Sequence, residues 1–216
     1  MQQESQLQSY APDIATTKRG HERCVALLES ATSLFLEYGY DAVSLDDIVN
    51  HAGGSKASIY KYFGNKEGLF KSICDYRRQL FLHDLNISLT ELPKDLRSYL
   101  IDTLVNFYHH LKRPDNSAFL RMILEQCQRN PDIALYIHEN GPKQIQKSIS
   151  DVLEMANLQG ILTCKNSDFS AQMYFGILRN IEWQVVMRIP FDKTEQEIIS
   201  YIEYAVDLFL IAHQKP

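Results

Sequence analysis

The segment Ser44–Phe70, SLDDIVNHAGGSKASIYKYFGNKEGLF, holds the side chains whose types and spacing best fit a defined chemistry. A short stretch of helical periodicity within it opens with four small or polar residues, Ser55, Lys56, Ala57 and Ser58. Serine and lysine can hydrogen-bond to base edges, and an alanine methyl can contact a thymine methyl. Such residues in the first turn of a helix predict contact with bases in a major groove.

The residues after this turn supply donors for phosphate oxygens. They are Tyr60, Lys61, Tyr62 and Lys66. Donors that flank a base-reading helix fix its position on the duplex, and the N-terminus of the next helix adds an anion site beside Lys66. The alternative is that the tyrosines belong to the core. Their interleaving with lysines favours phosphate contact, whereas Ile59 and Phe63 are expected inside.

The distribution of charge supports this interpretation although the whole chain carries a net charge of −5. Residues 18–78 hold nine Lys or Arg against eight Asp or Glu, and the stretch His51–Lys66 has three lysines and no acidic residue. A local basic face decides phosphate contact more than the sign of the whole chain does.

The elements that must position these side chains are helices throughout. Apolar residues recur every three or four positions, Gly39 ends the first helix, and Ser44 with Asp47 resembles a capping box. The expected helices cover residues 18–38, 45–52, 55–62, 65–83, 93–112, 115–130, 131–139, 142–158, 167–188 and 194–213. Because no alternating pattern is long enough for a sheet, the predicted fold class is all-α.

Two short helices joined by a glycine turn, after a longer supporting helix, are typical of a helix-turn-helix. The expected domains are a disordered arm at residues 1–17, a DNA-binding domain at 18–78, and a helical ligand-binding and dimerisation domain at 79–216. The arm contains no Lys or Arg before residue 18, so disorder is favoured over insertion into a minor groove.

Several other classes of protein are disfavoured by the sequence. The four cysteines, Cys24, Cys74, Cys127 and Cys164, are irregularly spaced, so buried thiols are expected rather than a zinc site or disulfides. No phosphate loop, nucleophile elbow or HExxH motif is present, so neither an enzyme nor a metal or cofactor site is expected. Without a membrane-length apolar run or a signal peptide, we expect a cytoplasmic protein.

From about Arg23 to Phe70 the chain resembles the TetR family of bacterial regulators. The matching positions are Leu34-Phe35, Gly39-Tyr40, Ser44, Ile48, Ala52-Gly53, Ser55, Ile59-Tyr60, Tyr62-Phe63, Lys66-Glu67 and Leu69-Phe70. The resemblance implies that Ser44, Tyr60, Tyr62 and Lys66 hold phosphates, and that Lys56, Ala57 and Ser58 face bases. Gly54 departs from the family pattern, which usually has an apolar residue there, and His51 stands where a small residue is common. Both changes are expected to loosen the turn.

The C-terminal half is similar to the AefR-like subgroup of the family over residues 119–162. Its last two helices are apolar over more of their circumference than one core needs, which favours self-association into a homodimer. The family forms its dimer through these helices. The residues expected at the interface are Tyr174, Ile177, Leu178, Ile181, Ile202, Ala205, Leu208 and Phe209.

The middle helices are rich in aromatic residues that could line a cavity for a small apolar or amphipathic ligand. The candidates are Phe107, Tyr108, Phe119, Met122, Cys127, Tyr136 and Trp183, with core packing as the alternative for each. The resemblance predicts a repressor that a ligand releases from a palindromic DNA operator. An activator of the same fold remains an alternative, as does a helical module that binds another protein.

Overall fold

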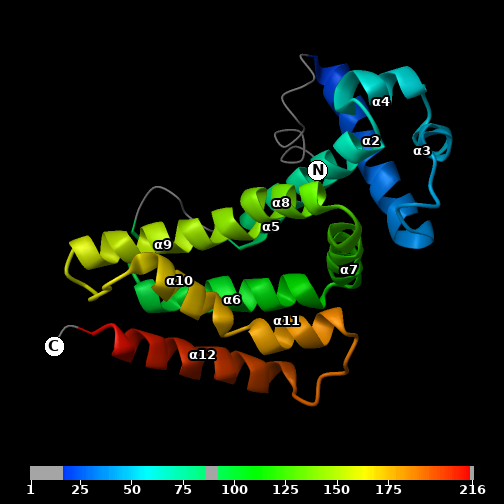
Figure 1. The fold of residues 1–216 in the computed structure, drawn as a ribbon. Coiled ribbons are helices and arrows are strands. Elements are labelled where there is room, and N and C mark those ends of the chain that lie inside the picture. Colours follow the sequence, from blue (N-terminus) through cyan, green and yellow to red (C-terminus); the bar gives the residue numbers. More distant parts are fainter. Residues whose placement is uncertain (1–16, 86–91, 215–216) are drawn as a thin grey trace. The chain divides into compact units, whose positions relative to one another are not determined.

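The computed structural model describes residues 17–85 and 92–214, and every regular element within these ranges is a helix (Figure 1). The helices of the first half are α2 (Lys18–Tyr38), α3 (Leu45–Ala52), α4 (Lys56–Phe63), α5 (Lys66–Asp84) and α6 (Leu96–Lys112). Those of the second half are α7 (Pro114–Arg129), α8 (Pro131–Asn140), α9 (Pro142–Leu158), α10 (Ser167–Gly176), α11 (Arg179–Val186) and α12 (Glu195–Ala212). The all-α prediction is confirmed.

The described residues form two compact units, which differ from the expected domains. The first unit reaches Leu80 and also contains Arg121–Ile137; the second contains Phe81–Leu120 and the residues from His138 onward. A division by chain order alone misses the second segment of the first unit. The predicted arm lies outside the described residues except for Thr17, which caps α2 by accepting a hydrogen bond from Gly20 N.

Capping residues place the helices of the first unit where the sequence predicts them. Ser44 and Asp47 form a complete capping box at the start of α3, and Asn65 Oδ1 accepts a 2.8 Å hydrogen bond from Gly68 N in the first turn of α5. Both bonds satisfy N–H groups that a helix start leaves open. The buried apolar side chains of this unit are Cys24, Leu27, Leu28, Ala31, Phe35, Val43, Ile48, Val49, Ile59, Phe63, Leu69, Phe70, Ile73, Tyr76, Met122 and Ile133.

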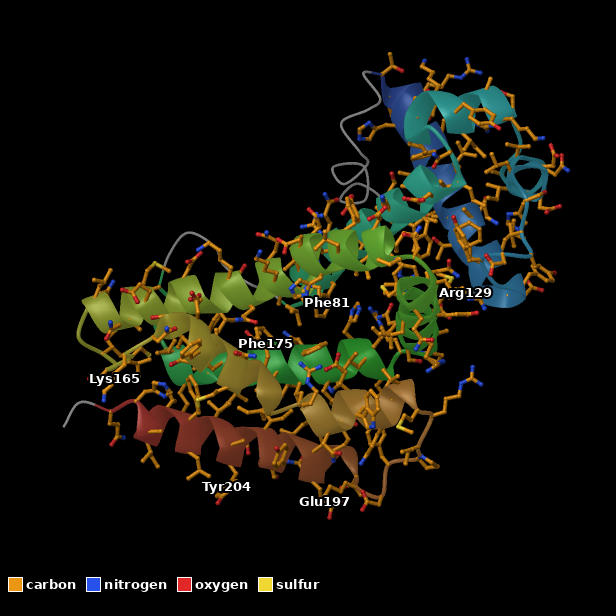
Figure 2. The ribbon with its side chains drawn as sticks, viewed as in Figure 1. Phe81, Arg129, Lys165, Phe175, Glu197 and Tyr204 are labelled. Carbon is orange, nitrogen blue, oxygen red and sulfur yellow. The ribbon has the colours of Figure 1, made fainter. Side chains whose placement is uncertain are left out.

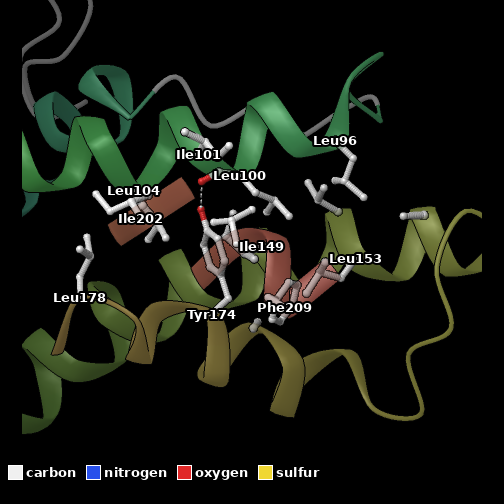
Figure 3. Packing of buried hydrophobic residues seen from close by; sticks show 14 of the residues in the cluster. Leu96, Leu100, Ile101, Leu104, Ile149, Leu153, Tyr174, Leu178, Ile202 and Phe209 are labelled. Carbon is white, nitrogen blue, oxygen red and sulfur yellow. Dashed lines mark hydrogen bonds between the residues drawn. The ribbon is translucent and has the colours of Figure 1, made fainter. Parts of the chain in front are cut away.

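The second unit has a continuous core between α6, α9, α10, α11 and α12 (Figure 3). Tyr174 lies at its centre, and its hydroxyl donates a 2.6 Å hydrogen bond to the carbonyl of Leu100 (Figure 3). A buried hydroxyl needs such a partner because leaving it unpaired would cost free energy. Leu153 and Phe209 pack in the same core. No helix in the described ranges is long and apolar enough to cross a membrane.

The helix expected over residues 167–188 is interrupted. α10 ends at Gly176 and α11 begins at Arg179. Between them Ile177 N bonds to Tyr174 O and Leu178 N to Phe175 O, a tight three-residue pattern. Glycine weakens a helix at the break because it has more conformational freedom to lose.

Candidate nucleic-acid interface

The helix α3 packs on α2, and α4 packs on α3, with the apolar side of α4 buried and its other face open to solvent. Ile59 is fully buried and Phe63 nearly so. By contrast, Tyr60 is 55% exposed, so it is not a core residue. The other exposed residues at the start and along the outer face of α4 are Ser55, Lys56, Ala57 and Lys61, with Ser58 and Tyr62 partly buried. The structure therefore places most of the predicted base-facing and phosphate-facing residues on α4 or at its N-cap, whereas Ser44 caps α3 and Lys66 begins α5.

Lys56 forms an ion pair that the sequence analysis did not anticipate. Its Nζ lies 2.8 Å from Asp46 Oδ2 in the first turn of α3. The hydrogen bond to this carboxylate raises the pKa of Lys56, so the side chain stays charged. Lys56 must leave Asp46 before it can bind a base. Because both side chains are largely exposed, breaking this ion pair costs little free energy.

Lys66 lies in a partly buried position at the first residue of α5. Its Nζ is 4.4 Å from the centroid of the Tyr40 ring and donates a 3.5 Å hydrogen bond to the carbonyl of Asp41. Burial lowers the pKa of Lys66. The aromatic ring orients the ammonium group through a cation–π contact, so Tyr40 is a positioning residue that the sequence analysis did not single out.

The side chain of Ser44 already caps α3 and is therefore not free to bind a phosphate at the same time. Its hydroxyl donates a 2.6 Å hydrogen bond to Asp47 Oδ2, and its Oγ accepts from Asp47 N at 3.2 Å. The Asp47 carboxylate accepts hydrogen bonds from the Ser44 hydroxyl and from Ser44 N, and these two bonds lower the pKa of Asp47. A phosphate contact by the Ser44 hydroxyl would therefore compete with the capping bond.

The turn between α3 and α4 has an unexpected neighbour. Arg23 of α2 extends across it, and Arg23 Nη1 donates a 3.5 Å hydrogen bond to the carbonyl of Ala52. A Cβ atom added at Gly54 would lie 1.0 Å from Arg23 Nη2. The departure of Gly54 from an apolar residue was the signal in the sequence, but only the fold shows which side chain takes the space.

Family models match both halves of the chain. The model described as bacterial regulatory proteins of the tetR family matches residues 27–73. The model described as the C-terminal domain of AefR-like transcriptional repressors matches residues 98–215, more than half of the chain. The chain belongs to the TetR family. It is accordingly a DNA-binding transcriptional regulator, and the resemblance to the family and to its AefR-like subgroup is confirmed.

Similar proteins include other regulators of this family. The HTH-type transcriptional regulator YezE of Bacillus subtilis is 28% identical over 151 residues, covering 67% of this chain and 75% of YezE. The repressor ComR of Escherichia coli is 32% identical over 107 residues, about half of each chain. Among solved structures, the flavonoid-responsive regulator FrrA has a TM-score of 0.76 at 28% identity, covering 89% of this chain and 97% of FrrA. A TetR-family regulator from Mesorhizobium loti has a TM-score of 0.78 at 20% identity, covering 91% and 99%.

The predicted ligand-lining residues of this TetR-family chain do not form one group. Phe107 is partly buried and its ring contacts those of Phe81 and Phe175, at centroid distances of 5.3 and 6.3 Å. Tyr108 instead packs in the core of the second unit, and Trp183 is 58% exposed, so the prediction that it faces an interior is wrong for the single chain. Met122 and Tyr136 belong to the first unit, whereas Phe119 belongs to the second.

The predicted dimer residues need a correction. Five of them are buried in the core of the second unit and cannot reach a partner: Tyr174, Leu178, Ile181, Ile202 and Phe209. Ile177 and Ala205 are partly buried, and Leu208 is exposed. Each helix carries more than one apolar stripe, and spacing alone does not tell which stripe the chain's own core uses.

The exposed stripe of α12 lies on its other side. It consists of Tyr201, Tyr204, Leu208 and Ile211, spaced three, four and three residues apart. Such spacing aligns side chains along one face of a helix. Tyr204 is 64% exposed and lies on the side of α12 away from α6 (Figure 2). Trp183 of α11 and Met187, the C-cap residue of this helix, are also exposed.

Proposed function

We propose that this TetR-family regulator is a repressor that binds a palindromic operator as a homodimer and leaves it when a small ligand binds. The observation that carries the proposal is the exposed face of α4. Its first turn presents Ser55, Lys56 and Ala57, and the next presents Tyr60 and Lys61. Small and polar residues early in a recognition helix suit base contact, and the later hydroxyl and ammonium groups suit phosphates.

Repression is favoured over activation by the relatives. ComR is named a repressor, and the IcaR protein of Staphylococcus epidermidis, 32% identical over 82 residues, is named a negative regulator. The matching C-terminal family model also carries the description of a transcriptional repressor.

The dimer would form through the exposed stripe of α12 together with Trp183 of α11 and Met187 at the C-cap of that helix. These side chains are apolar or aromatic and are uncovered in a single chain. Covering them with the same face of a second chain gives a two-fold symmetric contact. A two-fold dimer would present its two recognition helices to successive major grooves of a palindrome.

A planar aromatic compound is the ligand class we propose. Within the second unit Phe81 contacts both Phe107 and His110, with ring centroids 5.3 and 4.5 Å apart, and Phe107 contacts Phe175. These four rings are only partly buried, so a flat ligand can pack against them. The structural relative FrrA is named flavonoid-responsive, which is consistent with this class.

The operator is first recovered by selecting genomic fragments that bind the wild-type protein, and its affinity is then titrated at two salt concentrations. We expect tight binding that weakens steeply as salt rises. Lys61→Gln and Tyr60→Phe should each weaken it, whereas Lys147→Gln, an equal loss of charge on α9, should not. Failure to select any fragment, or equal affinity for random DNA, would overturn the proposal.

Ligand release is tested on the same complex. A panel of flavonoids and simple phenols is added to the protein–operator complex, and dissociation is followed by fluorescence anisotropy. We expect a compound of this class to release the wild-type protein and to act less well on Phe107→Ala. Aliphatic acids serve as the comparison set, and release by these alone would contradict the aromatic class.

A further inference from the structure

The guanidinium group of Arg23 occupies the space that a side chain at position 54 would fill. A Cβ atom built on Gly54 would lie 1.0 Å from Arg23 Nη2 and 2.2 Å from Arg23 Cζ. Gly54 also has a φ of +140°, a conformation that other residues rarely adopt. The backbone of the turn therefore favours glycine, and any larger side chain at position 54 would have to move the end of the Arg23 side chain.

The position of this positive charge is unusual. Gly54 directly precedes Ser55, the N-cap of α4, whose side chain makes no capping hydrogen bond. The N-terminal end of a helix carries partial positive charge, so a cation beside it is disfavoured unless an anion joins it. No carboxylate among the described residues lies within ion-pair distance of Arg23, whose recorded partner is the carbonyl of Ala52.

We propose that Arg23 is a further DNA-binding residue of this regulator, which binds a phosphate at the entry to the recognition helix. A long hydrogen bond of 3.5 Å to the carbonyl of Ala52 places the guanidinium over the turn, and its remaining N–H groups can bind phosphate oxygens. Arginine suits this role because its planar group can bind a phosphate through two N–H bonds. The proposal rests on the proposed use of α4 as the recognition helix.

The competing explanation is that Arg23 only stabilises the turn between α3 and α4 and does not contact DNA. The salt dependence of operator binding distinguishes these two roles. Each phosphate that a protein neutralises lowers the slope of log Kobs against log salt by about 0.9. A residue that only braces the turn changes affinity without changing this slope. The experiment therefore measures operator affinity from 50 to 300 mM salt for wild type, Arg23→Gln and Arg23→Lys.

For Arg23→Gln we expect a loss of affinity of about tenfold at low salt and a slope shallower by about 0.9 per protomer. Thermal unfolding should stay near that of wild type, and Arg23→Lys should keep the slope because the charge remains. Lys147→Gln, which removes one charge from α9, should match wild type in both readouts. An unchanged slope in Arg23→Gln would overturn the proposal. Absence of specific binding by wild type would instead count against the proposed function.

Gly54→Val provides an independent route to the same change. The new side chain must displace the guanidinium, so this variant should show the same reduction in slope as Arg23→Gln. Combining the two substitutions should reduce the slope no further. If the strained backbone prevents Gly54→Val from folding, as circular dichroism would show, the Arg23 variants decide the question alone. A further reduction of the slope in the double variant would contradict the shared role.

Discussion

Arg129, the last residue of α7 (Figure 2), forms an ion pair with Asp41 in the loop before α3. The carbonyl of the same Asp41 accepts the hydrogen bond from Lys66. Arg129 also pairs with Glu125 on its own helix, at 2.8 Å. A residue far along the chain thus neutralises a carboxylate beside a predicted phosphate-binding lysine.

Removing this neutralisation should weaken DNA binding. In Arg129→Gln the Asp41 carboxylate is left unbalanced near the phosphates, so we expect operator affinity to fall about threefold at low salt and less at high salt. Asp41→Asn combined with Arg129→Gln should restore it, because neither charge remains. Fluorescence anisotropy with the selected operator measures both. If the double variant bound as weakly as Arg129→Gln, the electrostatic explanation would fail.

The hydroxyl of Tyr174 should contribute to the stability of the second unit. It is fully buried and bonded to the Leu100 carbonyl, so Tyr174→Phe is expected to lower the free energy of unfolding by about 1 kcal/mol. Tyr60→Phe, which removes the hydroxyl of an exposed ring, should leave stability unchanged. Urea denaturation followed by circular dichroism makes the comparison. Equal stabilities for the two variants would rule out a contribution from the buried bond.

The ion pair between Arg97 and Asp207 predicts a dependence of stability on acid pH. Arg97 donates two hydrogen bonds to Asp207, of 2.6 and 2.9 Å, and they hold the pKa of this carboxyl below its ordinary value. A carboxyl whose pKa is lower in the folded protein stabilises the fold at pH values above its unfolded-state pKa of about 3.9. This stabilisation is lost as the pH falls through the folded-state pKa.

Asp207→Asn should therefore be less stable than wild type at pH 7, and the difference should shrink as the pH falls below the unfolded value of about 3.9. Thermal unfolding across pH 2–7 gives the measurement. Asp192→Asn is the matched control. Asp192 is exposed, and its Oδ1 lies 3.5 Å from Nζ of its sequence neighbour Lys193, so it links no two helices. A difference between Asp207→Asn and wild type that persisted unchanged at low pH would show that packing, not ionisation, is responsible.

A charge in the exposed stripe of α12 should dissociate the proposed dimer. Leu208 lies in the middle of this stripe, so Leu208→Glu is expected to give a monomer in sedimentation velocity. Loss of two-point attachment should then reduce operator affinity by about 100-fold or more. Leu158→Glu places the same charge at an exposed position of α9 and should stay dimeric. If Leu208→Glu remained a dimer, the dimer interface would have to lie on another face of the chain.

Much of the interface could be predicted from local sequence because its elements are defined by near neighbours. Ser44 with Asp47 marked the start of α3, and Asn65 marked the start of α5. The alternation of lysines and tyrosines after Ser55 indicated an exposed helix face, and the exposure of Tyr60 agrees with it. The roles of these residues on DNA stay predictions.

Other features depended on residues far apart in the chain. Arg23 and Gly54 are separated by 31 positions, and neither residue type indicates that one fills the space of the other. Arg129 and Asp41 are 88 positions apart. Local patterns carry no information on such contacts, because they arise only when helices pack.

The two sides of α12 show the same contrast between what local sequence determines and what distant residues determine. The sequence by itself determined that α12 is a helix with excess apolar surface, since periodicity and capping act over a few residues. Only the tertiary structure decided that Ile202 and Phe209 are buried in the chain's own core while Tyr204 and Leu208 stay exposed. The reason is that the rotation of a helix about its axis is set by the side chains packed against it from α6 and α10, and those partners come from distant segments.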